Sequence, residues 1–245
     1  MNTALLVRAM SYAAIPLCAA IAGSAIATRF PPPKALRSYL QHLAAGVVFS
    51  VVAVELLPDI THRHLPWAIA VGFSLGVGAM LGLKHFMGDS EHEEGGEAKP
   101  RSASTLLLGI GVDVALDGLL IALTFAAGAR AGKLLTLALA VEMLSLGLAV
   151  TASLQGVGYP RKKALVTCAA IFTLLPVGTL LGALTTPLLT GAVMEAVLSF
   201  GLAALLFLVT EELLVEAHRD GDTPAATALF FAGFLAFLLL GMSSE

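Results

Sequence analysis

Charged side chains are scarce in this sequence. They make up 13% of its 245 residues, against about 25% in a typical soluble domain. Hydrophobic residues make up 58%, which is more apolar surface than a soluble core of this size can bury. The chain therefore belongs in a lipid bilayer. Its net charge of −3 is small, so it gives no support to a nucleic-acid partner.

Aromatic residues and cysteines are also few, at 7% aromatic residues and two cysteines. Cys18 and Cys168 lie in separate apolar runs without a Cys-x-x-Cys neighbour, so we interpret both as packing thiols and leave the redox compartment open. The sequence also lacks a nucleophile–base pair and a phosphate-binding loop. We therefore expect no enzymatic activity, no catalytic residue and no cofactor. Glycine, alanine and leucine dominate, and small residues let membrane helices approach closely.

Long apolar runs are present in number. A helix needs about 20 apolar residues to cross a bilayer, and membrane-spanning backbone must be helical or form a closed barrel. The runs here are too long for barrel strands, so the sequence predicts an all-α polytopic membrane protein, with residues 1–245 as one transmembrane domain. Eight stretches qualify: Thr3–Thr28, Tyr39–Pro58, Leu65–Phe86, Thr105–Ala127, Leu134–Gly156, Ala164–Ala183, Ala192–Val215 and Thr223–Gly241.

The first stretch has two interpretations. It could be a signal peptide cleaved after Ala25-Ile26-Ala27, but its length favours a retained span. With eight spans, ten Lys and Arg residues fall in the loops of one side and four in those of the other. Because basic loops stay in the cytoplasm, both termini are predicted to face outward from a cell (inner) membrane. A seven-span chain would keep the same loop assignments.

The longest loop, at about residues 87–104, holds almost no apolar residues, so we expect a flexible cytoplasmic linker. Metal capture through His92 and the neighbouring carboxylates is the alternative. On the outer side, His62 and His64 beside Asp59 form a weaker candidate capture patch.

Three acidic residues are predicted to share one depth inside the bilayer. Asp113 and Asp117 are four residues apart, which places them on one face of a helix. Counting about 1.5 Å per residue along two antiparallel neighbours puts Glu142 level with Asp117. A buried ionisable group costs at least about 2.5 kcal/mol, so such groups are candidate functional residues. A shared divalent cation would relieve their repulsion. A protonated structural cluster and a proton relay without metal remain alternatives.

Four further acids are secondary candidates for a gate: Glu55, Asp59, Glu211 and Glu212. They lie near helix ends, where solvation explains them about as well. The segment Glu55-Leu56-Leu57-Pro58-Asp59 is similar to Glu212-Leu213-Leu214-Val215-Glu216, and the two run in opposite directions across the membrane. This similarity indicates an inverted repeat, an arrangement found in transporters with a site at the midplane.

Together these segments resemble the ZIP (Zrt/Irt-like) family of divalent metal transporters, and the resemblance covers nearly the whole chain. The segments that carry it are Gly46–Ser50 with Glu55–Asp59, Asp117–Ala122, Gly147–Val150, Gly158 with Arg161–Ala164, Leu175–Gly182 and Glu212–Glu216. It implies eight spans in a 3+2+3 arrangement, outward termini, a variable cytoplasmic loop between the third and fourth spans, and a homodimer.

The chain departs from the family at several ligand positions. Asp117 matches the family's aspartate, whereas Asp113 and Glu142 stand where the family carries histidine. Glu55 stands at the family's histidine in the second span, and Leu175 at its glutamate in the sixth.

Three more ligand positions of the family are apolar here. Val114 replaces an asparagine, and Met143 and Leu146 replace two glutamates. At most one metal site is therefore expected, and without imidazole it should prefer harder ions than Zn²⁺.

We predict a transporter that carries a divalent cation of the Zn, Mn or Fe class towards the cytoplasm by alternating access. Asp113, Asp117 and Glu142 are its predicted metal ligands. The expected partners are the divalent ion, as substrate, the bilayer and a second copy of the chain. Two alternatives stay open: a changed substrate, such as protons or a non-metal solute, and a sensor or scaffold that transports nothing.

Overall fold

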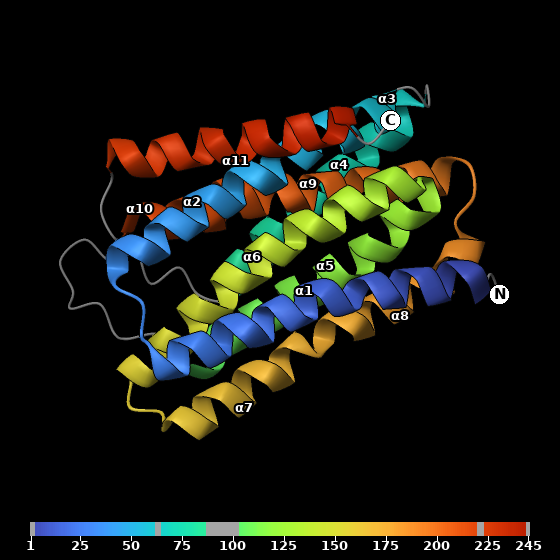
Figure 1. The fold of residues 1–245 in the computed structure, drawn as a ribbon. Coiled ribbons are helices and arrows are strands. Elements are labelled where there is room, and N and C mark those ends of the chain that lie inside the picture. The colour runs from blue at the N-terminus through green and yellow to red at the C-terminus, as the bar shows by residue number, and fades with distance from the viewer. Residues whose placement is uncertain (1–2, 62–64, 87–102, 220–222, 244–245) are drawn as a thin grey trace.

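The computed structural model describes residues 3–61, 65–86, 103–219 and 223–243, and within these ranges the chain is helical and has no strand. This part of the chain contains eight helical spans long and apolar enough to cross a membrane, as predicted. They form one bundle with both termini at the same end (Figure 1). In chain order the elements are α1 (Thr3–Arg29); α2 (Lys34–Val51), η1 (Val52–Leu56) and α3 (Leu57–Thr61); α4 (Pro66–Phe86); α5 (Ala103–Ala127); α6 (Ala129–Gly156); α7 (Arg161–Phe172), α8 (Leu174–Thr185) and η2 (Thr186–Leu188); α9 (Ala192–Phe207), η3 (Leu208–Leu213) and α10 (Leu214–Arg219); and α11 (Pro224–Ser243).

Most helices extend beyond their predicted apolar runs, because polar residues at a helix end can reach the aqueous interface. Helix α2 begins at Lys34, directly after Pro33, whose extended backbone ends the proline run. The predicted loop reaches too far at its second end, since Ala103 and Ser104 already belong to α5. Its other residues, 87–102, lie outside the described ranges, as do His62 and His64, so neither capture patch is tested.

The sixth span is divided, which the apolar pattern did not predict. Helix α7 ends at Phe172, α8 begins at Leu174, and Thr173 lies between them. Pro176 accounts for the interruption, because it has no N–H to donate to the carbonyl four residues earlier, that of Phe172, and its ring would crowd that carbonyl. The two parts continue across the bundle as one span.

Two spans contain π-helical segments, in which the backbone makes one wider turn. Segment η1 holds Glu55, and η3 holds Glu211 and Glu212. Segment η1 is followed by Pro58, which cannot join the α-helical hydrogen-bond pattern. Segment η3 contains no proline, so nothing in its sequence marked it. The two segments occupy the two pentapeptide regions whose similarity indicated an inverted repeat.

The helices pack in four main pairs: α1 with α6, α5 with α8, α2 with α11, and α4 with α9. Glycines permit the closest approaches. A Cβ at Gly118 of α5 would overlap the carbonyl of Leu175 in α8, and one at Gly178 of α8 would overlap the carbonyl of Ala115 in α5. Contact at such short range lets dispersion forces and helix dipoles hold the pair together in lipid, where the hydrophobic effect between helices is absent.

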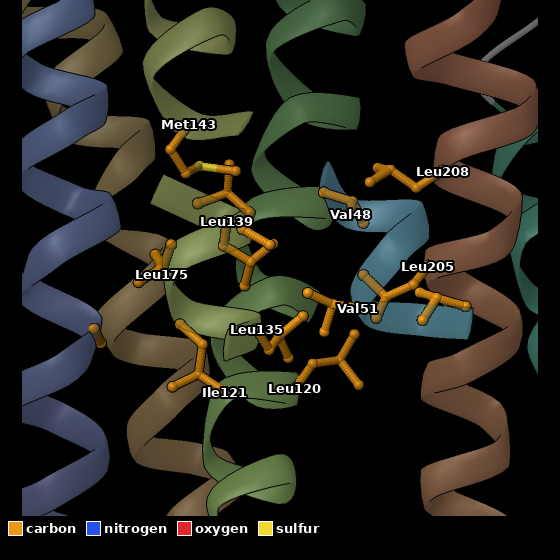
Figure 2. Packing of buried hydrophobic residues seen from close by; sticks show 14 of the residues in the cluster. Val48, Val51, Leu120, Ile121, Leu135, Leu139, Met143, Leu175, Leu205 and Leu208 are labelled. Atoms are coloured by element: carbon orange, nitrogen blue, oxygen red, sulfur yellow. The ribbon is translucent and has the colours of Figure 1, made fainter. Parts of the chain in front are cut away.

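Helix α6 is the most buried of the eight spans, and α5 is its antiparallel neighbour. Figure 2 shows Leu135, Leu139 and Met143 of α6 in the packed interior, with Val48 and Val51 of α2 on one side and Leu205 and Leu208 beyond them. Side chains on α5 and α6 are therefore shielded from both lipid and water. This shielding sets the cost of any charge placed there.

Candidate metal centre

Asp113 and Asp117 of α5 and Glu142 of α6 lie together in the interior. One carboxylate oxygen from each lies within 4.8 Å of the others. Their exposed fractions are 9%, 2% and 1%. The four-residue spacing on α5 and the matched depth of α6 thus bring together the three residues that the sequence predicted. Whether they bind a metal stays a prediction.

The three carboxylates have no partner of opposite charge within the described part of the chain. No hydrogen bond or ion pair joins any of their side chains to another group among those residues. Asp117 Oδ2 and Glu142 Oε2 are buried and unpaired. An unpaired carboxylate in a dry interior costs several kcal/mol, on the order of what a buried ion pair is meant to offset. The arrangement therefore lacks one component, which a cation or protons would supply.

Glu212 is nearer to this cluster than the sequence analysis placed it. Its charge acts on all three carboxylates, and its side chain is partly buried in η3. The signal was present in the depths: Glu212 lies about 10 Å from the end of α10, and Asp113 about 15 Å from the start of α5. The similarity of the two pentapeptides drew attention to the helix end instead. Glu212 is a fourth acid beside the three.

Glu55 is used differently, since it is paired. Its Oε1 lies 3.1 Å from the Nη2 of Arg130, at the start of α6, and the same nitrogen donates to the carbonyl of Gly241 in α11 at 2.7 Å. The Glu55 side chain is 11% exposed. The guanidinium thus joins three spans at the end of the bundle where the chain termini lie. Asp59, in α3, is partly buried one turn further on and is not part of the central cluster.

Glu211 is paired as well, but at the surface. Its Oε2 accepts a hydrogen bond from Lys84 of α4 at 3.1 Å, and the two side chains are 46% and 37% exposed. This pair lies on the side of the membrane opposite to Glu55. The four secondary candidates thus take different roles: Glu212 lies beside the cluster, and the other three lie away from it.

The positions where this chain departs from the ZIP ligand pattern are filled by packing. Val114 and Met143 are fully buried, and Leu146 is partly buried against the main core. Leu175 is also buried, with its carbonyl against Gly118. These apolar side chains leave no oxygen or nitrogen ligand for a second ion, so the geometry agrees with at most one ion at the centre.

Sequence reasoning missed several buried polar atoms on α2 and α9. Ser50 Oγ, Ser199 Oγ and Glu195 Oε2 are buried without a hydrogen-bond partner among the described residues. Glu195 stands in the first turn of α9 yet is 7% exposed. Short hydroxyls in apolar runs give no signal of their own, because serine is common at ordinary helix contacts in membranes.

Comparison with known proteins gives two relatives of similar length. The zinc transporter ZIPB of Bordetella bronchiseptica is 34% identical over 221 residues, which cover 80% of this chain and 68% of that protein. The zinc transporter GufA of Myxococcus xanthus is 30% identical over 210 residues, or 82% of each chain. No family model matches the chain. Identity at this level, across most of both proteins and over the same eight spans, shows that the chain belongs to the ZIP family.

Proposed function

We propose that this protein carries a divalent metal ion across the membrane and that Asp113, Asp117 and Glu142 bind the ion on its way. The observation that carries the proposal is the three buried carboxylates, with oxygens within 4.8 Å and no cation partner in the described chain. Carboxylates that close together repel one another strongly, and a divalent cation both removes the repulsion and uses the unpaired oxygens.

The ligand set also bears on the identity of the ion. Carboxylate oxygens suit hard cations such as Mn²⁺ and Fe²⁺, and they bind Zn²⁺ with water completing its coordination. The two relatives are named zinc transporters, which supports zinc as the cargo. We propose an ion of the Zn, Mn or Fe class, bound singly, because packing side chains occupy the positions of a second ligand set.

The helix pairs support a mechanism of alternating access. Exchanging the first three spans with the last three turns the α1–α6 pair into the α8–α5 pair, and the α2–α11 pair into the α9–α4 pair. The π-helical segments η1 and η3 also exchange. This is the pattern of a 3+2+3 inverted repeat with α5 and α6 at its centre, and such repeats rock around a fixed site.

Three further properties complete the proposal. The excess of basic residues in one set of loops supports outward termini and a cell-membrane location. Movement of the ion towards the cytoplasm and a homodimeric assembly are what membership of the ZIP family suggests. Each has its own test: reporter fusions at the termini for topology, vesicle uptake against efflux for direction, and light scattering for the dimer.

The central test is uptake of Zn²⁺, Mn²⁺ or Fe²⁺ into vesicles that contain the purified protein and its Asp117→Asn variant. Removing one of three charged ligands should lower uptake by more than about 100-fold, since the number of charged ligands tunes affinity over orders of magnitude. Glu211→Gln is the matched control, because it removes a carboxylate that is exposed and already paired with Lys84. It should transport normally.

Two outcomes would contradict the proposal. Uptake unchanged by Asp117→Asn would remove the cluster from the path of the ion. Proton flux that depends on Asp117 but needs no metal would support the proton relay, to which buried unpaired carboxylates are also suited.

A further inference from the structure

Two histidines from different spans lie against each other at the end of the bundle opposite to Glu55 and Arg130. His42 stands two turns into α2, and His218 stands near the end of α10. Their ring centroids are 5.0 Å apart, with the ring planes tilted by 54°. The central carboxylate cluster does not include them.

The proton position on His42 follows from its hydrogen bond. Its Nδ1 lies 2.8 Å from the carbonyl oxygen of Ser38, which can only accept, so Nδ1 carries a proton. A second proton on Nε2 would make the ring a charged group in a place where it is 2% exposed. The ring is therefore neutral, and Nε2 presents a lone pair. That atom is buried and has no hydrogen-bond partner in the described chain.

His218 repeats this arrangement in the facing helix. Its Nδ1 lies 2.5 Å from the carbonyl oxygen of Leu214, one helical turn earlier, so it too donates through Nδ1. In the neutral ring Nε2 is then the basic nitrogen. His218 is exposed, unlike His42, and so connects the buried ring to water. The two side chains together offer two imidazole lone pairs, one from inside the bundle and one at its surface.

Ser38 fixes the pair from behind. Its carbonyl orients His42, and its hydroxyl donates to the carbonyl of Ala217 at 2.8 Å. Ala217 precedes His218, so one buried serine sets the positions of both histidines across the α2–α10 contact. Histidines that bind metals in proteins characteristically donate their second ring nitrogen to a backbone carbonyl, which selects the tautomer and orients the ring. Both rings here meet that condition.

We propose that His42 and His218 form a second metal site, which takes a divalent transition metal of borderline softness such as Zn²⁺, with water filling the remaining coordination positions. Imidazole suits such ions, and a site with only two protein ligands exchanges its metal readily. The site is chemically unlike the all-carboxylate centre on α5 and α6. The proposal concerns binding alone, so it stands whether or not the central cluster transports an ion.

The experiment measures Zn²⁺ binding to the purified full-length protein by equilibrium dialysis, in an Asp117→Asn background that removes the central site. His42→Gln and His218→Gln should each lower Zn²⁺ affinity by at least 10-fold. His85→Gln is the matched control, since His85 lies on α4 at the same end of the bundle. Cu²⁺ then serves as the spectroscopic probe: pulsed electron paramagnetic resonance should detect two coordinated imidazoles, and one fewer in either histidine variant.

Unchanged Zn²⁺ affinity and an unchanged imidazole count in His218→Gln would overturn the proposal. This variant decides the matter even if His42→Gln fails to fold, because His218 is exposed and its loss leaves no cavity. Loss of Zn²⁺ uptake in Asp117→Asn with the histidine site intact would support both sites. Normal uptake in Asp117→Asn would contradict the central site alone.

Discussion

The central cluster and the Glu55–Arg130 pair deal with buried carboxylates in opposite ways. At the bundle end, Arg130 supplies a guanidinium to a carboxylate that is 11% exposed. At the centre, three carboxylates exposed by 9% or less have no such partner in the described chain. Buried charges are normally paired, because an unpaired one costs several kcal/mol.

The difference teaches that the absence of a built-in cation at the centre is not a limit of the fold. The same chain places a guanidinium between spans elsewhere and joins η1, α6 and α11 with it. A permanent cation at the centre would satisfy the acids and leave nothing for an ion to do. An exchangeable cation satisfies them only while it is bound, which is what a transport site requires.

The largest effect is expected from giving the centre its own cation. Glu142→Lys places an ammonium beside Asp113 and Asp117, as Arg130 stands beside Glu55. Metal uptake into vesicles should fall by more than about 100-fold, because a like charge now occupies the place of the ion. The folded protein should be no less stable without metal, which thermal unfolding in detergent would measure.

Glu142→Gln is the companion variant, since it removes the ligand without adding a charge. It should lose less uptake than Glu142→Lys. Equal losses would mean that the ammonium has no effect beyond the missing carboxylate, and the comparison with Arg130 would fail.

A smaller effect is expected at the paired carboxylate. Arg130→Gln removes the charge partner of Glu55 and one donor to the carbonyl of Gly241. The free energy of unfolding should fall by about 1–3 kcal/mol, the typical cost of leaving a part-buried charged hydrogen bond unmade. Lys133→Gln, an exposed basic residue on the same helix, is the control and should change little. A loss confined to Lys133→Gln would contradict the structural role of Arg130.

The smallest effect is expected at the exposed pair. Lys84→Gln breaks the contact with Glu211, whose side chain is 46% exposed. Water and salt already screen both charges, so the free energy of unfolding should change by less than about 1 kcal/mol. The measurement is the same detergent unfolding at low and high salt. A loss as large as that of Arg130→Gln would show that exposure does not separate the two pairs.

Much of the architecture could be predicted from local pattern alone. The eight spans follow from hydrophobic run length, and Asp113 with Asp117 share a face because a helix turns every 3.6 residues. Adding depth brought Glu142 to their level, since adjacent helices joined by a short turn are antiparallel. Glu212 was within reach of the same count but was assigned to the helix end.

Other features depend on which faces the helices turn to each other, and run length carries no such information. The sequence by itself determined the bilayer, the number of spans and the depth of the central acids, because hydropathy and helical rise act locally. Only the tertiary structure decided that Glu55 is paired and the central acids are not, and that His42 meets His218. Those outcomes depend on helix rotation and on contacts between distant segments, which close glycine packing fixes only when the whole bundle assembles.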